Sequence, residues 1–256
     1  MPDVAPAPLH VDSEVGPLRR VLLHRPGLEH QRLTPSNCED LLFDDVLWVK
    51  RARQEHDAFA DTLAEAGVEV LYVHDLLAEV LKDAAARDWL LDRVVTDEDH
   101  GPELADAVRG LMEGADPDTA AEHLIGGLMV DQLPGSSVAD SLRAEVLGPH
   151  GFVLPPLPNH LFTRDTTCWI YGGVSLNPMA KPARRRETAH LEAVYRFHPL
   201  FAETGFTTWF GGADRSLGSA TLEGGDVLVI GNGAVLIGMG ERTTPQAVDA
   251  LARRFF

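Results

Sequence analysis

The chain has 256 residues, of which 45% are hydrophobic and 24% charged, so it is long enough to bury a sizeable core and shows no compositional sign of disorder. Its 39 acidic residues outnumber its 22 basic ones, and the resulting net charge of −17 repels a phosphate backbone, which argues against a nucleic-acid partner. No run approaches 18 uninterrupted apolar residues, and the first residues carry acids and prolines where a secretory peptide has a basic start and an apolar stretch, so we expect no membrane partner and no secretion.

The two cysteines, Cys38 and Cys168, lie far apart in the sequence and in unrelated contexts. Two cysteines in this arrangement predict neither a disulfide framework nor a thiolate metal site, and so small a number favours a reducing compartment. We therefore expect a cytoplasmic protein.

The first part of the chain alternates strands and a helix. Residues 20–24 have the pattern of a strand, which the sequence Arg-Pro-Gly ends. Residues 49–66 have the pattern of a helix, Gly67 fits its C-terminal cap, and residues 68–73 follow as the next strand. We assign residues 1–75 to a first α/β unit.

The next segment differs in kind, because its apolar residues recur at helical spacing between charges. From Asp75 to His150 there are 17 acidic and 5 basic residues, which concentrates most of the acidic excess in this region. We predict that residues 76–150 form an inserted acidic helical subdomain with a structural role.

Residues 151–256 repeat the plan of the first unit twice. In the second unit, residues 166–170 and 173–176 form a predicted hairpin, followed by a helix over 186–204 and a strand over 206–210. In the third unit, residues 226–230 and 234–237 flank Gly-Asn-Gly, a strong hairpin signal.

The third unit continues with a predicted helix over residues 244–254, with Pro245 at its start. The strand that closes the first two units has no counterpart after this helix. We therefore expect the chain to be an incomplete version of a longer fold. In the alternative interpretation, Phe255 and Phe256 begin a short terminal strand.

Two acidic side chains occupy corresponding places in the second and third units. Asp165 and Glu223 each lie at the edge of a predicted strand, which brings them to the same end of a pseudo-symmetric structure. Carboxylates accept two hydrogen bonds from a planar guanidinium, and a bound cation removes the penalty of placing two carboxylates together. The two glycines after Glu223 allow the chain to bend, so that Asp226 need not follow strand alternation.

Taken singly, the sequence FTRD at residues 162–165 also fits a surface strand, and EGGD at residues 223–226 also fits an ordinary turn. Three motifs occur together, however: FTRD at residues 162–165, EGGD at 223–226, and LTPSNCEDLLFDDVLWVKRARQEHDAF at 33–59. In this combination the chain resembles the arginine deiminases from about Pro17 to Phe256. The resemblance implies a pentein-type α/β propeller of pseudo-repeated ββαβ units, here incomplete, with the helical subdomain inserted.

The resemblance also implies roles for individual residues. Asp165 and Glu223 would grip the guanidinium of L-arginine, and Asp226 would support them. The residues that would contact the rest of the substrate are Asn159 at its amino-acid end, Phe162 along its aliphatic stem, and Arg184 and Arg242 at its carboxylate. Residues 42–45 resemble the loop that closes over the pocket, although a loop-to-helix staple would have the same pattern.

In the resembled family, a cysteine thiolate attacks the guanidinium carbon, ammonia leaves, and a histidine activates water to release citrulline. No metal or cofactor is needed, and a homo-oligomer is expected. The units that supply this cysteine and histidine have no counterpart in the sequence, and we expect neither Cys38 nor Cys168 to act as the nucleophile. The alternatives are a non-catalytic remnant or arginine-binding partner subunit, and a methylarginine hydrolase or amidinotransferase.

Overall fold

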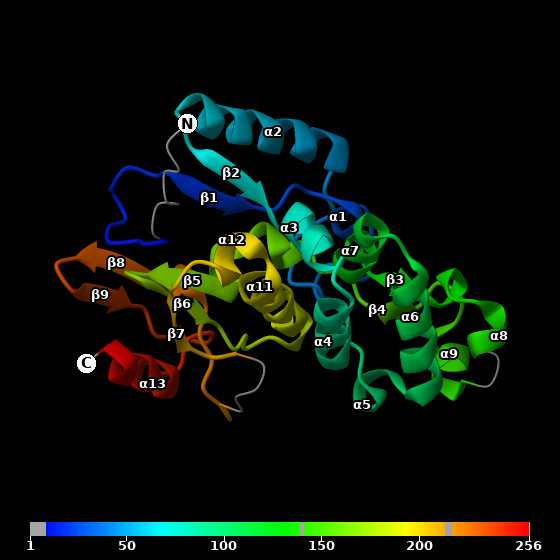
Figure 1. The fold of residues 1–256 in the computed structure, drawn as a ribbon. Coiled ribbons are helices and arrows are strands. Elements are labelled where there is room, and N and C mark those ends of the chain that lie inside the picture. Colours follow the sequence, from blue (N-terminus) through cyan, green and yellow to red (C-terminus); the bar gives the residue numbers. More distant parts are fainter. Residues whose placement is uncertain (1–8, 139–140, 213–216, 256) are drawn as a thin grey trace.

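The computed structural model describes residues 9–138, 141–212 and 217–255, and it has an α/β architecture in which small sheets lie beside helices (Figure 1). Phe256, for which a terminal strand is the alternative prediction, lies outside these residues, whereas Phe255 belongs to a helix. No helix among the described residues is both long and apolar enough to cross a membrane.

The first unit is a parallel pair of strands with a helix between them. Strand β1 (Arg20–Leu23) pairs with β2 (Glu69–Tyr72), and the intervening chain contains α1 (Leu28–Gln31) and α2 (Val49–Glu65). Gly67 ends α2 with a φ of 84°, as its predicted capping role requires. The predicted strands and helix of this unit are confirmed.

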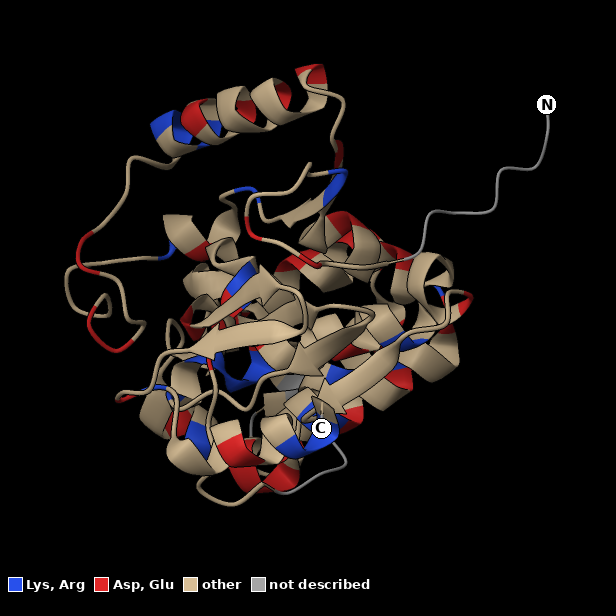
Figure 2. Ribbon diagram, turned by 90° about the vertical axis from the view of Figure 1, so that its left-hand side faces the viewer, with Lys and Arg blue, Asp and Glu red and all other residues tan. Residues whose placement is uncertain are grey.

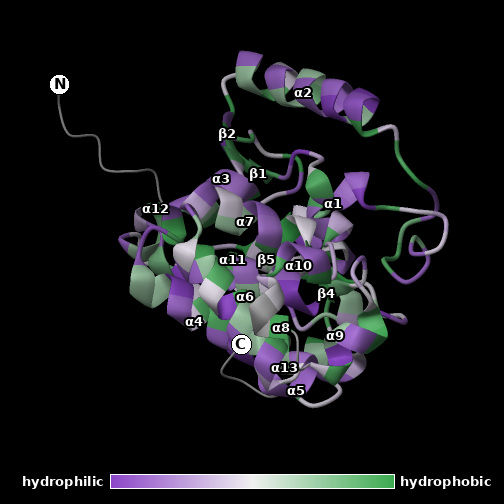
Figure 3. Ribbon diagram, turned by 90° about the vertical axis from the view of Figure 1, so that its right-hand side faces the viewer, coloured by the Kyte–Doolittle hydropathy of each residue, from purple (hydrophilic) through white to green (hydrophobic). Residues whose placement is uncertain are grey.

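Helix α2 lies over this pair of strands at the edge of the molecule (Figures 1 and 3). Its basic residues gather in its first turns and acidic ones follow toward its end (Figure 2). This order opposes the helix dipole, which favours acidic side chains at the start of a helix. Helix α2 therefore depends on packing against β2 and on local ion pairs such as Arg51–Glu55.

The second unit is a three-stranded sheet in which β6 (Gly173–Leu176) lies between β5 (Thr167–Ile170) and β7 (Thr207–Phe210). Strand β5 is antiparallel to β6, as the hairpin prediction requires, and β7 is parallel to it. The single helix predicted over 186–204 is wrong. Helix α11 (Arg185–Phe197) ends before His198, whose side chain caps a separate short helix, α12 (Pro199–Ala202), because Pro199 cannot continue the hydrogen bonding of α11.

The third unit begins with the 3-10 turn η4 (Gly224–Asp226) and the antiparallel hairpin of β8 (Val227–Gly231) and β9 (Ala234–Ile237). The turn between the strands places Gly231, Asn232 and Gly233 at positive φ, which explains the two glycines. Helix α13 (Pro245–Phe255) follows and begins at the predicted proline.

Helices occupy most of the segment between the first and second units. These are α3 (Val73–Val80), α4 (Ala84–Val94), α5 (Asp97–His100), α6 (Pro102–Gly114), α7 (Pro117–Gly126), α8 (Gly135–Val138) and α9 (Leu142–Leu147). The short strands β3 (Leu128–Met129) and β4 (Phe152–Leu154) form an antiparallel pair around the last of them. Side chains of Asp83, Thr96, Asp116 and Ser141 cap helices in this segment.

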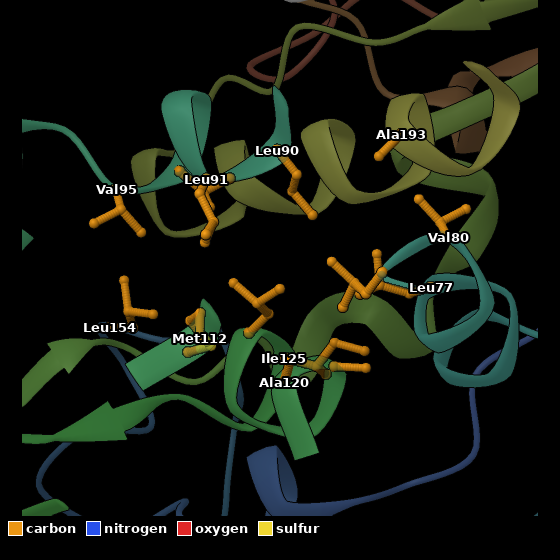
Figure 4. Close-up of a cluster of buried hydrophobic side chains, with 14 of the residues drawn as sticks. Leu77, Val80, Leu90, Leu91, Val95, Met112, Ala120, Ile125, Leu154 and Ala193 are labelled. Atoms are coloured by element: carbon orange, nitrogen blue, oxygen red, sulfur yellow. The ribbon is translucent and has the colours of Figure 1, made fainter. Parts of the chain in front are cut away.

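The largest hydrophobic core joins these helices to the second unit. It contains Leu77 of α3, Leu90 of α4, Ile125 of α7 and Ala193 of α11, and Figure 4 shows these side chains pointing toward one another. A smaller core under β5 and β8 packs against α13. The two cores fix the second and third units, and the segments that precede β5 and β8 carry the predicted site.

Candidate functional site

Asp165 and Glu223 lie immediately before the first strands of the second and third units. Asp165 belongs to α10 (Thr163–Thr166), a single helical turn that runs into β5, and Glu223 precedes η4. A Cβ atom on Gly224 would overlap the carbonyl oxygen of Arg164, and one on Gly225 would lie 2.7 Å from Oδ1 of Asp165. The two glycines therefore allow the two acidic segments to lie side by side.

The guanidinium of Arg184 lies between the two carboxylates. Its Nη1 donates to Oδ2 of Asp165 at 2.8 Å and is 3.9 Å from Oε2 of Glu223. The side chain of Arg184 is only 3% exposed, and those of Asp165 and Glu223 are 20% and 11% exposed. The positive charge of Arg184 offsets the repulsion between two carboxylates that are both largely buried.

Arg184 has further partners, which the sequence did not reveal. Its Nε and Nη2 donate to Oε2 of Glu187 at 3.1 and 2.9 Å, and Nη2 also donates to the carbonyl oxygen of Asn159 at 3.1 Å. Burial lowers the pKa of Arg184, but the charges of Glu187 and Asp165 outweigh burial and raise it, so the guanidinium stays charged. In this structure four of its five N–H groups are engaged by the protein.

Glu187 is a residue of the candidate site that the sequence did not reveal. It is fully buried in the first turn of α11, and burial raises its pKa to about 7 against the opposing effect of Arg184. The only sequence signal for this pair is the spacing of three residues between Arg184 and Glu187 at the start of a helix.

Arg242 binds Glu223 from the other side. Its Nη1 donates to Oε1 of Glu223 at 2.8 Å, and its side chain is 34% exposed. The next residue, Thr243, connects Glu223 with Asp226: its hydroxyl accepts from the backbone N–H of Glu223 at 3.1 Å and donates to Oδ2 of Asp226 at 2.5 Å. Asp226 therefore reaches Glu223 through a threonine that was not among the predicted residues.

Asn159 and Phe162 connect this site with the predicted closing loop. Nδ2 of Asn159 donates to the carbonyl oxygen of Leu41 at 2.7 Å, and Leu42 has a φ of 61°. The ring of Phe162, which is half exposed, lies 6.4 Å from the ring of Phe43. The loop is thus held against the chain that carries Asn159.

A buried histidine pair lies behind Asn159. Nε2 of His160 is 2.9 Å from Nδ1 of His190, and their rings are stacked. Burial lowers the pKa of His190 to about 3 and that of His160 well below 6.5, so both are neutral near pH 7. Near these two, Glu29 accepts from His24 and His30. The described residues contain no group of three or more potential ligands arranged to hold a metal ion.

Both cysteines are buried. Cys168 lies in β5, and burial raises its pKa to about 12, so its thiol stays protonated at neutral pH. Cys38 belongs to a small apolar cluster with Leu33, Leu41 and Phe43. The protonated thiol of Cys168 therefore lacks the properties of a nucleophilic thiolate.

The site therefore contains the carboxylates of Asp165 and Glu223 around the guanidinium of Arg184, together with a second arginine, an asparagine and a half-exposed aromatic ring. A family model described as arginine deiminase matches residues 39–256. This match covers most of the chain, including Asp165 and Glu223 with all their partners named above. The chain belongs to the arginine deiminase family.

Proposed function

We propose that this chain binds L-arginine by its guanidinium for deimination to L-citrulline and ammonia, with Asp165 and Glu223 as the binding carboxylates. One observation carries this proposal: the two side chains already converge on a guanidinium, that of Arg184. A site that accommodates one such group between two carboxylates has the charge and shape to recognise another.

The other predicted residues have proposed roles around this pair. Asp226 supports Glu223 through Thr243, and Phe162 lines the aliphatic stem of the substrate. Asn159 binds the amino-acid end, and the loop over residues 42–45 closes the pocket. These assignments follow the family resemblance. The hydrogen bond of Asn159 to Leu41, just before the loop, and the proximity of the rings of Phe162 and Phe43 support them.

Arg184 and Arg242 are proposed to pair with the substrate carboxylate. Arg242 is the more available of the two, because its side chain is partly exposed and has Glu223 as its ion-pair partner. Arg184 is buried and must release one of its present partners before it can bind a ligand. We expect that an arriving guanidinium replaces Arg184 at Asp165 and leaves Arg184 free to turn toward the carboxylate.

The covalent step needs a thiolate other than Cys38 or Cys168. In the proposed reaction the thiolate adds to the guanidinium carbon, and the bond from this carbon to one terminal nitrogen breaks as that nitrogen takes up a proton and leaves as ammonia. Water then adds to the same carbon, gives up its protons and expels the sulfur as thiolate, which yields citrulline. The contribution of the residues described here is to hold the carbon in place and neutralise its charge. We further propose that the three α/β units belong to a pentein-type propeller.

An arginine-binding chain without catalytic activity is the second candidate, and the burial of both cysteines favours it. A methylarginine hydrolase or an amidinotransferase would use similar carboxylates, but the family match favours arginine itself.

Isothermal titration of L-arginine into the chain tests the proposal. Each of Asp165→Asn and Glu223→Gln should weaken binding about 10-fold or more, since a hydrogen bond to a charged group contributes about 1.5–3 kcal/mol. Asp57→Asn is the matched control, because Asp57 of α2 forms an exposed ion pair with Arg25, outside the site. Equal affinity in the Asp165→Asn and Asp57→Asn variants would refute the assignment. A citrulline assay on the same samples separates the catalytic from the non-catalytic candidate.

A further inference from the structure

Arg164, which precedes Asp165 in α10, reaches across to the segment that follows Glu223. Its Nε donates to the carbonyl oxygen of Gly224 at 3.2 Å, and its Nη2 donates to that of Val227 at 2.5 Å. These two carbonyls lie at the two ends of η4. One side chain therefore connects the backbone that carries Asp165 to the backbone on the C-terminal side of Glu223.

The opposite edge of the same guanidinium is held by Glu14. Nη1 and Nη2 of Arg164 donate to the two carboxylate oxygens of Glu14 at 2.9 and 2.6 Å. Glu14 in turn accepts from the N–H of Val229 at 2.8 Å, and its own N–H donates to the carbonyl oxygen of Val229 at 3.1 Å. Glu14 thus joins β8 and Arg164, and it fixes the orientation of the guanidinium.

The geometry requires arginine. A planar fork with five N–H groups can bind a carboxylate along one edge and two carbonyls along another, whereas a lysine ammonium is a single point with three donors. Gly224 adds a second constraint, because any side chain there would overlap the carbonyl of Arg164. Both features keep α10 and η4 at a close, fixed separation.

We propose that Arg164 is a positioning residue that sets the spacing between Asp165 and Glu223, with Glu14 holding Arg164 in place. Arg164 does not touch the ligand in this proposal. The proposal rests on the proposed function for the identity of the ligand, L-arginine. The connection that Arg164 makes between α10 and η4 does not depend on that function.

The test compares Arg164→Lys and the milder Glu14→Gln with Arg25→Lys. Arg25 is a matched control, since it forms an equally close two-point ion pair with Asp57 and its side chain is 45% exposed against 46% for Arg164. Two quantities are measured: backbone hydrogen exchange over residues 223–230 and the affinity for L-arginine. Both are repeated for Arg164→Lys in the Glu223→Gln background.

We expect Arg164→Lys to speed exchange over residues 223–230 at least several-fold and to weaken arginine binding at least 5-fold, with smaller shifts in the same direction for Glu14→Gln. Arg25→Lys should change neither. In the Glu223→Gln background, Arg164→Lys should cause little further loss of affinity, because the spacing it controls no longer matters. A purely structural role would instead give the same fold-loss in both backgrounds.

Unchanged hydrogen exchange and unchanged affinity for L-arginine in Arg164→Lys would overturn the proposal. So would an equal fold-loss of affinity on Arg164→Lys in the unsubstituted chain and in the Glu223→Gln variant. If the unsubstituted chain binds no L-arginine, the proposed function fails. In that case exchange alone decides whether Arg164 connects the two segments: faster exchange over residues 223–230 supports the connection, and unchanged exchange overturns it.

Discussion

Replacing Glu187 by glutamine should alter how the stability of the protein depends on pH. Glu187 is fully buried against Arg184, and burial raises its pKa from 4.5 to about 7. Between these two values the folded state holds a proton that the unfolded state releases, so stability falls as pH rises through 7. Arg184, Asp165 and Arg186 are the charges that face this carboxyl, and all three are retained in the variant.

The magnitude follows from linkage. With a pKa of about 7 in the folded state and 4.5 in the unfolded state, the titration of Glu187 removes roughly 2–3 kcal/mol of the free energy of unfolding between pH 5 and pH 8. Glutamine does not titrate and still offers an oxygen to Arg184. The difference in unfolding free energy between wild type and Glu187→Gln should therefore shift by about this amount over the interval.

Urea unfolding of both proteins at pH 5, 6, 7 and 8 measures this difference. Histidines and other titrating groups contribute equally to both curves, so the difference isolates Glu187. Parallel curves, within about 0.5 kcal/mol across the range, would refute the reasoning that burial dominates the titration of this carboxyl.

Two further predictions concern the core and the cysteines. Leu77→Ala should lower the free energy of unfolding in urea by about 2–5 kcal/mol, because Leu77 is fully buried. As a control, Leu142→Ala, at a position 79% exposed, should change it by no more than about 0.5 kcal/mol. Similar losses of stability in the two variants would contradict the packing of Leu77 in the core. In the folded protein at pH 8, iodoacetamide should leave Cys168 unmodified by mass spectrometry, because the pKa of its buried thiol is raised to about 12. Modification in urea is the control for the second experiment, and rapid labelling of Cys168 without urea would show that its thiol is accessible and ionised.

Local signals in the sequence predict much of the α/β framework. The turn at Gly231, Asn232 and Gly233 requires positive φ, and the sequence supplies the residues that tolerate it, so the hairpin around it is predictable. The helix predicted over residues 186–204 breaks at Pro199, which has no backbone N–H to continue the hydrogen bonding of α11. The division at residues 75 and 150 stays a prediction, and the largest core contains residues from both sides of each boundary.

The site was predictable only in part. The proximity of Asp165 and Glu223 is expected from their corresponding places in the predicted second and third units, and the structure brings both to the same guanidinium. Arg184 was predicted as a site residue at the substrate carboxylate, but its place between the two acidic side chains and its pairing with the buried Glu187 could not be predicted. Ion pairing at the start of α11 depends on which side chains burial forces together. Thr243 was missed for the same reason, since a hydroxyl that links two acidic segments carries no local sequence signal.

The most direct test of the central claim compares L-arginine with L-citrulline as ligands of the unsubstituted chain and of the Asp165→Asn, Glu223→Gln double variant. The two ligands share a skeleton, and citrulline carries a neutral ureido group in place of the charged guanidinium. We predict that the unsubstituted chain binds arginine at least 10-fold more tightly and that the double variant loses this preference, because charge-assisted hydrogen bonds are about twice as strong as neutral ones. Equal affinity for the two ligands, or a preference for arginine that survives in the double variant, would contradict the claim that these carboxylates bind the guanidinium.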